Sequence, residues 1–203
     1  MPGPSEAIID LYSRRARDFD ADRDKSLFER PWLDAFLAHV PGSGTVLDLG
    51  CGSGEPIARY LIDQGRRLTG VDAAPTLVDL CRERFPDHDW IVADMHCLDL
   101  RRAFDGVIVW HSAIHLTPAA HRGMFAVWRR HVRPGGALMF TSAPKACQTV
   151  GEWRGEPLYH GSLSPDEYRA GLDAAGFDLL AHRISDPDCG DATVWLARRR
   201  MSD

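Results

Sequence analysis

The segment between Val46 and Gly54 restricts the possible fold more than any other part of this chain. It reads V-L-D-L-G-C-G-S-G, so an apolar run ends in three glycines at alternate positions, and residues 57–63 follow with helical spacing. Glycine adopts positive φ and lets a ligand approach bare backbone, and the start of a helix adds unpaired N–H groups at the same place. The pattern therefore predicts a strand, a ligand-binding turn and a helix. The turn residues expected to contact the ligand are Gly50, Cys51, Gly52 and Gly54.

A carboxylate follows at the end of a second predicted strand. Residues 67–72 read R-L-T-G-V-D, which places Asp72 18 residues after Gly54. In doubly wound sheets an acidic residue at this position accepts hydrogen bonds from ribose hydroxyls. Ala73 comes next and is assigned to the same site. The glycine turn and Asp72 together predict a nucleoside-type cofactor.

The spacing of the glycines and a second carboxylate narrow the choice of cofactor. Dinucleotide-binding turns read G-x-G-x-x-G and hold a pyrophosphate, whereas this turn reads G-x-G-x-G and Asp48 stands two residues before its first glycine. A carboxylate there repels a pyrophosphate and favours an ammonium or sulfonium group. S-adenosylmethionine has a ribose, an ammonium and a sulfonium, and no phosphate. Asp48 is expected to order the turn or to meet the ammonium of this cofactor.

Residues 46–54 and Asp72 resemble the first two motifs of the class I (Rossmann-like) S-adenosylmethionine-dependent methyltransferases. The resemblance implies an α/β fold with a doubly wound, seven-stranded, mostly parallel sheet in the order 3-2-1-4-5-7-6, whose final strand is antiparallel. It also implies that Asp94 meets the adenine amino group and that the backbone N–H of Met95 meets the adenine ring. Tyr12, on the first helix, is expected to close over the cofactor.

The rest of the chain alternates between strand and helix patterns, which favours a mainly parallel sheet. Predicted strands cover residues 45–49, 68–71, 90–93, 104–110, 137–142, 177–184 and 192–198, and predicted helices between them cover residues 55–64, 75–85, 118–132 and 165–175. Two amphipathic helices, 5–19 and 27–39, come first, so residues 1–40 are expected to form a helical cap over the cofactor edge. No linker is evident, which predicts a single domain over residues 1–203. Residues 143–164 are expected to form a long, irregular, aromatic loop that acts as a lid.

Two histidines follow the fourth predicted strand, where the methyl donor and the acceptor should meet. The segment reads W-H-S-A-I-H from Trp110, which is expected beside the cofactor, to His115. It lacks the Asn/Asp-Pro-Pro-Tyr/Phe tetrapeptide of DNA and protein amide methyltransferases, which counts against methylation of adenine or glutamine amino groups. His111 or His115 could take a proton from the acceptor, or both could simply be packed and hydrogen-bonded. His160, in the aromatic loop, is the third candidate, although the aromatic residues around it could instead pin the loop to the sheet edge.

Composition limits the partners and the compartment. The formal net charge of −5 gives no electrostatic attraction to nucleic acid or to an anionic membrane. The five cysteines include no C-x-x-C pair, which argues against a disulfide framework or a zinc site. The two histidines have no evident third ligand with which to form a metal site. The first residues lack the pattern of a signal peptide. We therefore expect reduced thiols, no metal, a cytoplasmic location, and a monomer or a homodimer.

The sequence predicts an enzyme that transfers a methyl group from S-adenosylmethionine to an oxygen, nitrogen or sulfur atom of a small molecule. Residues 151–161, the W-H-S stretch at Trp110 and the segment from Asp188 to Trp195 resemble a bacterial branch of small class I methyltransferases that does not itself define an acceptor. Two alternatives remain at this point. One is a protein that binds S-adenosylmethionine without catalysis, and the other is a dinucleotide-dependent oxidoreductase, which the missing G-x-x-G step and Asp48 disfavour.

Overall fold

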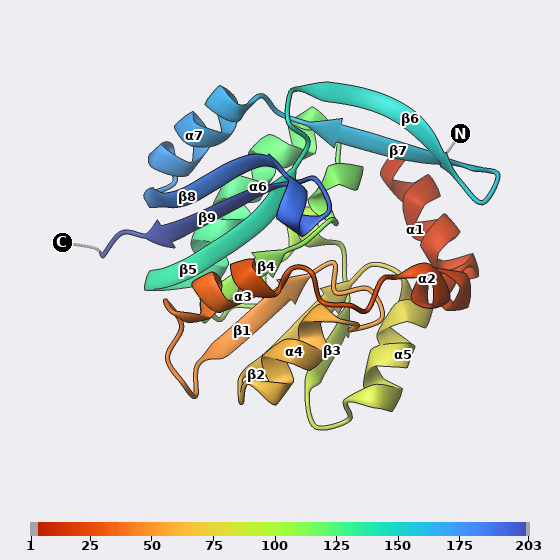
Figure 1. Cartoon of the computed structure of the whole chain (residues 1–203), viewed down its shortest axis with the longest axis horizontal. Helices are drawn as coiled ribbons and strands as arrows, with labels where there is room; N and C mark the ends of the chain where they lie inside the picture. Colours follow the sequence, from red (N-terminus) through yellow and green to blue (C-terminus); the bar gives the residue numbers. More distant parts are fainter. Residues whose placement is uncertain (1–3, 202–203) are drawn as a thin grey trace.

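Seven strands form one sheet in the order β3-β2-β1-β4-β5-β9-β8 in the computed structural model, which describes residues 4–201 (Figure 1). Strands β1 to β5 are parallel, and β9 is antiparallel to both of its neighbours. The strands numbered 6 and 7 lie outside this sheet, so the order is the one that the resemblance implies. The bounds are β1 Thr45–Leu49, β2 Arg67–Asp72, β3 Asp89–Val92, β4 Phe104–Val109, β5 Val132–Ser142, β8 Phe177–Asp186 and β9 Ala192–Arg199.

The helices lie on both faces of the sheet and over one of its edges. The predicted helix 5–19 is two helices, because Arg15 leaves the helical conformation with φ −109° and ψ 19°. The helices are α1 Pro4–Arg14, α2 Ala16–Asp22, α3 Arg30–Leu37, α4 Ile57–Asp63, α5 Pro75–Arg84, α6 Pro118–His131 and α7 Pro165–Ala174, with 3₁₀ turns η1 Met95–Cys97, η2 Ala113–His115 and η3 Pro187–Cys189. In residues 4–201 no helix has the length and apolar character needed to cross a membrane.

Alternate side chains of the central strands enter two separate cores. Leu47 and Leu49 of β1 pack in the cluster that contains the apolar residues of α6 and α7. Val46 packs in the other cluster, with residues of α3, α4 and α5. This alternation is what a strand with two buried faces requires. The parallel pairing of the strands brings the carboxyl ends of β1, β2 and β4 to one edge of the sheet, where the predicted site residues lie.

The expectation of an irregular loop over residues 143–164 is wrong. Most of this segment is an antiparallel hairpin of β6 Cys147–Trp153 and β7 Glu156–Ser162. Arg154 and Gly155 connect the strands, both with positive φ (52° and 81°), as a two-residue hairpin turn requires. The sequence conceals the hairpin because β6 is exposed along most of its length, so it carries no alternation of buried and polar residues.

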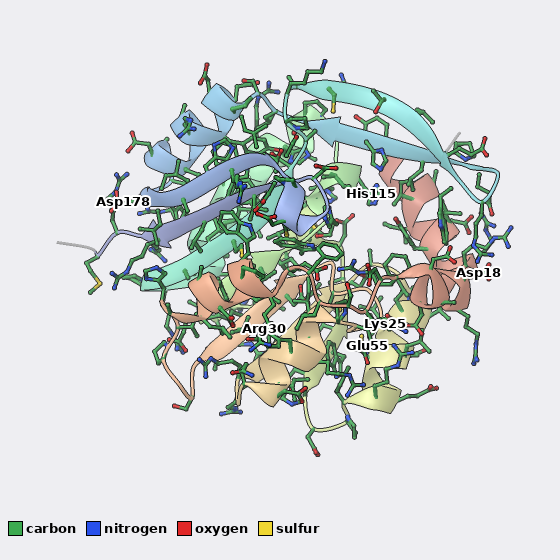
Figure 2. The ribbon with its side chains drawn as sticks, in the orientation of Figure 1. Asp18, Lys25, Arg30, Glu55, His115 and Asp178 are labelled. Carbon is green, nitrogen blue, oxygen red and sulfur yellow. The ribbon has the colours of Figure 1, made fainter. Side chains whose placement is uncertain are left out.

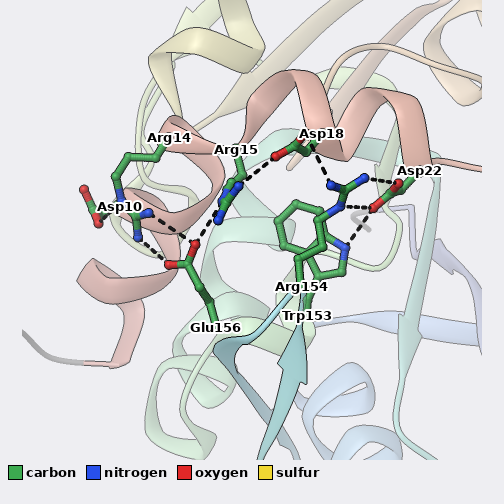
Figure 3. Close-up of polar contacts among 8 residues, drawn as sticks. All are labelled: Asp10, Arg14, Arg15, Asp18, Asp22, Trp153, Arg154 and Glu156. Carbon is green, nitrogen blue, oxygen red and sulfur yellow. Dashed lines mark hydrogen bonds and ion pairs between the residues drawn. The ribbon is translucent and has the colours of Figure 1, made fainter.

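The turn of this hairpin is fastened to α1 and α2 by a chain of ion pairs (Figure 3). Glu156 accepts hydrogen bonds from Arg14 (2.7 Å) and Arg15 (3.0 Å), and Arg154 donates to Asp22 at 2.8 Å. Exposed ion pairs stabilise weakly one by one. These ion pairs nonetheless join two segments about 140 residues apart in sequence. Together, α1, α2 and the hairpin cover the carboxyl ends of the central strands (Figure 1).

Candidate functional site

A cavity of about 410 Å³ opens at the carboxyl ends of β1, β2 and β4, beneath α1, α2 and β7. Its volume lies within the range of small-ligand sites. Every predicted site residue except Gly54 contributes to its wall. These residues are Tyr12, Asp48, Gly50, Cys51, Gly52, Asp72, Ala73, Asp94, Met95, Trp110, His111, His115 and His160.

The backbone donors of the glycine turn are already paired within the protein, contrary to the expectation of free N–H groups. Gly50 and Cys51 both donate to the carbonyl of Val71, at 2.7 and 3.1 Å, and Gly52 donates to the carboxylate of Asp72 at 2.9 Å. A pyrophosphate needs such donors to be free. This pairing, with two carboxylates at the turn, disfavours a dinucleotide.

Protein side chains leave no room for a Cβ at any of the three glycines of the turn. A Cβ at Gly54 would lie 2.9 Å from the ring of Phe85, which does not line the cavity. A Cβ at Gly50, which has φ +73°, would lie 2.2 Å from the Cβ of Ser112. The Ser112 hydroxyl donates to the carbonyl of Leu49 at 2.7 Å, which holds the segment after β4 against the turn.

Asp72 is the last residue of β2, and both of its carboxylate oxygens accept hydrogen bonds while keeping further acceptor positions free. One oxygen accepts the N–H of Ala74 and the other that of Gly52, each at 2.9 Å. Burial raises the pKa of this carboxyl, and the two N–H groups oppose that rise. An ionised carboxylate offers about four acceptor positions, so two remain for hydroxyl groups in the cavity.

Asp48 is a buried carboxylate without a hydrogen-bond partner among the described residues. Its exposed fraction is 3%, and among the described residues none donates a hydrogen bond to its side chain. Burial, and secondarily the charge of Asp72, raise the pKa of Asp48 to about 7, while Arg23 acts in the opposite direction. Such a group is stabilised in its ionised form by a cation in the cavity.

Arg23 is a wall residue that the sequence analysis missed. It is the single arginine or lysine among the described residues of the cavity wall, and Glu29, which is fully buried, accepts a hydrogen bond from it. Arg23 stands just after α2, in a connection without periodicity, where an arginine is normally solvated. No sequence signal distinguishes it from the other arginines of the N-terminal region.

Both ring nitrogens of His115 form hydrogen bonds within the protein. Its Nδ1 lies 2.9 Å from the carbonyl of Tyr159, which only accepts, so Nδ1 carries the hydrogen in this pair. Its Nε2 then accepts the hydroxyl of Tyr12 at 3.0 Å. Burial, and then the charge of Asp72, raise the pKa of Tyr12 to about 12, so the phenol keeps its proton. Figure 2 shows His115 between α1 and the hairpin, where this chain of bonds joins them.

His111 and His160 have imidazole rings without a hydrogen-bond partner among the described residues. His111 faces the open cavity, has φ 48°, and donates its backbone N–H to Thr141 at 2.8 Å. His111 is exposed to the cavity, and desolvation by the protein around its ring lowers its pKa to about 4, as it does for the less exposed His115. His160 stacks on His115 with ring centroids 5.3 Å apart, and burial lowers the pKa of His160 as well. At pH 7 His111 and His115 are therefore neutral and weak as bases.

The end of β3 and the indole of Trp110 complete the wall. Asp94 accepts the backbone N–H of His96 at 3.1 Å and pairs with its ring at 2.7 Å, and Met95 follows at the start of η1. The indole N–H of Trp110 is buried and has no partner among the described residues. No cluster of three potential metal ligands occurs in residues 4–201.

The charges of the wall favour a ligand with cationic character. Four acidic side chains and one guanidinium line the wall, so acidic groups outnumber basic ones beside the glycine turn and the strand ends. The carboxylates are Asp48, Glu55, Asp72 and Asp94. S-adenosylmethionine fits this donor set, with hydroxyls for Asp72 and an ammonium for Asp48.

Comparison with known proteins decides the family. A family model described as "Methyltransferase domain" matches residues 46–136. Malonyl-[acyl-carrier protein] O-methyltransferase of Serratia marcescens is 31% identical over 188 residues, which cover 86% of this chain and 69% of that protein. The chain belongs to the class I S-adenosylmethionine-dependent methyltransferases. It is an enzyme, and S-adenosylmethionine is its methyl donor.

One further relative and one solved structure are also similar to this methyltransferase. A tRNA (carboxymethyluridine(34)-5-O)-methyltransferase of Mus musculus is 30% identical over 67% of this chain, but the chain covers only 20% of that protein. The crystal structure of 1,6-didemethyltoxoflavin-N1-methyltransferase of Burkholderia thailandensis, with bound S-adenosylhomocysteine, superposes with a TM-score of 0.75 at 23% identity. The superposition covers 98% of this methyltransferase and 92% of that chain, and it shows a shared fold.

Replacing Gly52 of the methyltransferase with valine should abolish cofactor binding before it unfolds the protein. Gly52 has φ +56°, and a Cβ there would lie 2.9 Å from the ring of Phe19. Valine therefore adds backbone strain and pushes α2 away from the turn. Calorimetry with S-adenosylhomocysteine measures the loss. Gly65→Val is the matched control, because Gly65 also has positive φ (+77°) but has nothing within 4 Å of its Cβ position. Normal binding by the Gly52 variant would reduce the turn to a structural role.

Proposed function

We propose that this methyltransferase transfers the methyl group of S-adenosylmethionine to a small molecule that binds beneath α1 and the hairpin. The proposal rests on one observation, that α1, α2 and β7 cover the end of the cavity away from the strand ends. The wall there is largely apolar, with Ile9, Ile114 and Leu158. A largely apolar pocket suits a small acceptor. The net charge of −5 disfavours a nucleic acid.

The cofactor would lie along the strand ends, with its ribose on Asp72. Ala73, Asp94 and Met95 would hold the adenine, as the resemblance implies. The backbone from Gly50 to Gly52 would face the methionine part. Tyr12 would cover the cofactor from α1, with its hydroxyl fixed by His115. Gly54 has no direct place in this arrangement, since it packs on Phe85.

The bound cofactor supplies an electrophilic methyl group on a sulfonium. The chain then has to align the acceptor with that methyl and to exclude water, which is a large part of such catalysis. His111 and His160 are the candidate proton acceptors, because His115 is held by Tyr12 and Tyr159. Their low basicity suits an acceptor that is already ionised or that loses its proton readily.

The curated relatives favour one such acceptor class. The names malonyl and carboxymethyluridine both denote groups with a carboxyl function. A carboxylate is ionised at neutral pH and needs no base, which matches a site whose histidines are weak bases. Carboxylic acids are therefore the first acceptor class to test, followed by phenols, thiols and amines.

A screen of small acceptors, measured as release of S-adenosylhomocysteine, tests the proposed function. We expect turnover with a member of one of these classes, and strongly reduced turnover by the Asp72→Ala variant at a cofactor concentration below saturation. Turnover with tRNA alone would overturn the small-molecule proposal. Tight binding of S-adenosylmethionine without turnover on any of these small acceptors would contradict the proposed acceptor classes.

A further inference from the structure

A second hollow, of about 260 Å³, adjoins the main cavity where the tip of the hairpin meets α2. Tyr12, Phe19, Arg23 and Leu158 line both spaces, whereas Trp153 lines the hollow alone. We propose that this hollow holds the body of the methyl acceptor and selects an aromatic ring, with Trp153 as the specificity-determining residue. This inference rests on the proposed transfer of the methyl group to a small molecule beneath α1 and the hairpin.

The cofactor needs most of the space in the main cavity. A cavity of about 410 Å³ suits one drug-sized ligand, and S-adenosylmethionine is itself a molecule of that size. The reacting atom of the acceptor must still reach the methyl group, so the remaining atoms of the acceptor extend out of the cavity. The hollow offers them room, because it shares part of its wall with the cavity.

One face of the hairpin leads from the cavity into the hollow. Directly opposed residues of an antiparallel pair point to the same side of the sheet, and alternate residues along a strand share a face. Trp153 is opposite Glu156, so the register places Trp153, Leu158 and His160 on one face. His160 lines the cavity, Leu158 lines both spaces, and Trp153 lines the hollow. An acceptor whose reacting group lies near His160 would follow this row to Trp153.

Three aromatic rings in contact with one another border the hollow. Tyr12 and Phe19 meet edge to face with ring centroids 5.2 Å apart, and Tyr12 and Trp153 stack at 5.9 Å with 28° between their planes. The hydroxyl of Tyr12 is held by His115 at 3.0 Å, which fixes the central ring of the three. Aromatic rings in such arrangements attract one another beyond the effect of the area they bury. A flat ring in the hollow therefore gains contacts that a saturated ring does not.

The charged side chains of the hollow each have a partner in the protein. The donor and acceptor pairs are Arg154 with Asp22, the backbone N–H of Ser26 with Asp24, and Arg23 with Glu29. The indole N–H of Trp153 also bonds to Asp22, at 3.2 Å, so its ring surface is the part left for a ligand (Figure 3). We therefore expect the acceptor to be uncharged where it lies in the hollow.

Pairs of acceptors that differ only in the ring test the inference. 4-Phenylbutanoate and 4-cyclohexylbutanoate carry the same reacting group, and the corresponding alcohols, thiols and amines form further pairs. The saturated ring has at least as much apolar surface, so burial alone would not favour the phenyl member. Release of S-adenosylhomocysteine by the wild type gives kcat/KM for each. We expect a value about threefold or more higher for the phenyl member of the pair that reacts, the ratio that an aromatic contact provides.

Two substitutions of Trp153 separate aromatic character from apolar bulk. Trp153→Phe keeps an aromatic ring and should keep the preference for phenyl. Trp153→Leu keeps an apolar side chain and should lose the preference, with kcat/KM for the phenyl acceptor about tenfold lower. Both variants lose the bond to Asp22, so the comparison between them is free of that effect. Val150→Ala, at an exposed position on the opposite face of the hairpin, should behave as the wild type does.

The remaining outcomes separate this inference from the proposed function. Equal kcat/KM for both rings in the wild type, or an unchanged preference in Trp153→Leu, would overturn the inference, while the turnover itself would uphold the proposed function. An equal loss of affinity for S-adenosylhomocysteine in Trp153→Leu, measured by calorimetry, would make Trp153 a support for Tyr12 over the cofactor and would also overturn the inference. Turnover with no member of any pair would contradict the proposed function, and the inference with it.

Discussion

Replacing Asp72 with alanine should weaken binding of S-adenosylhomocysteine at least tenfold. The substitution removes the acceptor for the ribose hydroxyls, and each hydrogen bond to a charged group contributes about 1.5–3 kcal/mol. It also releases the N–H of Gly52, which Asp72 holds at 2.9 Å, so the glycine turn loses an anchor. Calorimetry measures the dissociation constant directly.

Two further variants separate these effects. Asp72→Asn keeps an oxygen for the turn while it removes the charge, so its loss should lie between those of the wild type and the alanine variant. Asp79→Ala changes an exposed acid on α5 outside the cavity wall and should leave binding unchanged. An unchanged dissociation constant in a folded Asp72→Ala protein would refute the ribose assignment.

Replacing Asp48 with asparagine should stabilise the ligand-free protein at pH 8 and weaken S-adenosylmethionine binding at least tenfold. The pKa of Asp48 is raised to about 7, mainly by burial, from an ordinary value near 3.9. The folded protein therefore binds this proton more tightly than the unfolded chain does. The resulting stabilisation is complete below about pH 4 and is lost as the pH rises to about 7. Asparagine resembles the protonated acid, so the variant avoids a decrease of up to about 4 kcal/mol in the free energy of unfolding at pH 8.

The same carboxyl makes cofactor binding depend on pH. The ammonium of the cofactor favours ionised Asp48, which is the minor form at pH 6 and the major form at pH 8 in the free protein. Affinity of the wild type for S-adenosylmethionine should therefore rise about tenfold between these values, whereas the Asp48→Asn variant should show no such rise from this group. Denaturant unfolding and calorimetry at both pH values check the two halves of the prediction. Lower stability of the variant at pH 8, with normal binding, would contradict it.

The sheet and its cofactor edge could be predicted because they depend on local patterns. The run before Gly50 marks β1 with the bounds that the structure has, Thr45–Leu49. Parallel strands bring their carboxyl ends to one edge, so Asp48, Asp72 and Asp94 were expected together before any contact was known. The structure lines one cavity with all three.

The missed features depend on contacts between segments that lie far apart in sequence. The pairing of the Gly50 and Cys51 N–H groups comes from the carbonyl of Val71 on the neighbouring strand, and no pattern inside the turn reports it. Arg23 enters the site because a buried acid, Glu29, holds it there. The hairpin of β6 and β7 escapes detection because β6 is exposed along most of its length and follows no hydrophobic period.

A crystal structure of the protein with S-adenosylhomocysteine tests the central claim most directly. The account predicts the nucleoside at the ends of β2 and β3, with both ribose hydroxyls within about 3 Å of the Asp72 carboxylate oxygens. It also predicts the ammonium of the cofactor at Asp48. A nucleoside bound away from Asp72, or a methionine part turned away from Asp48, would contradict it.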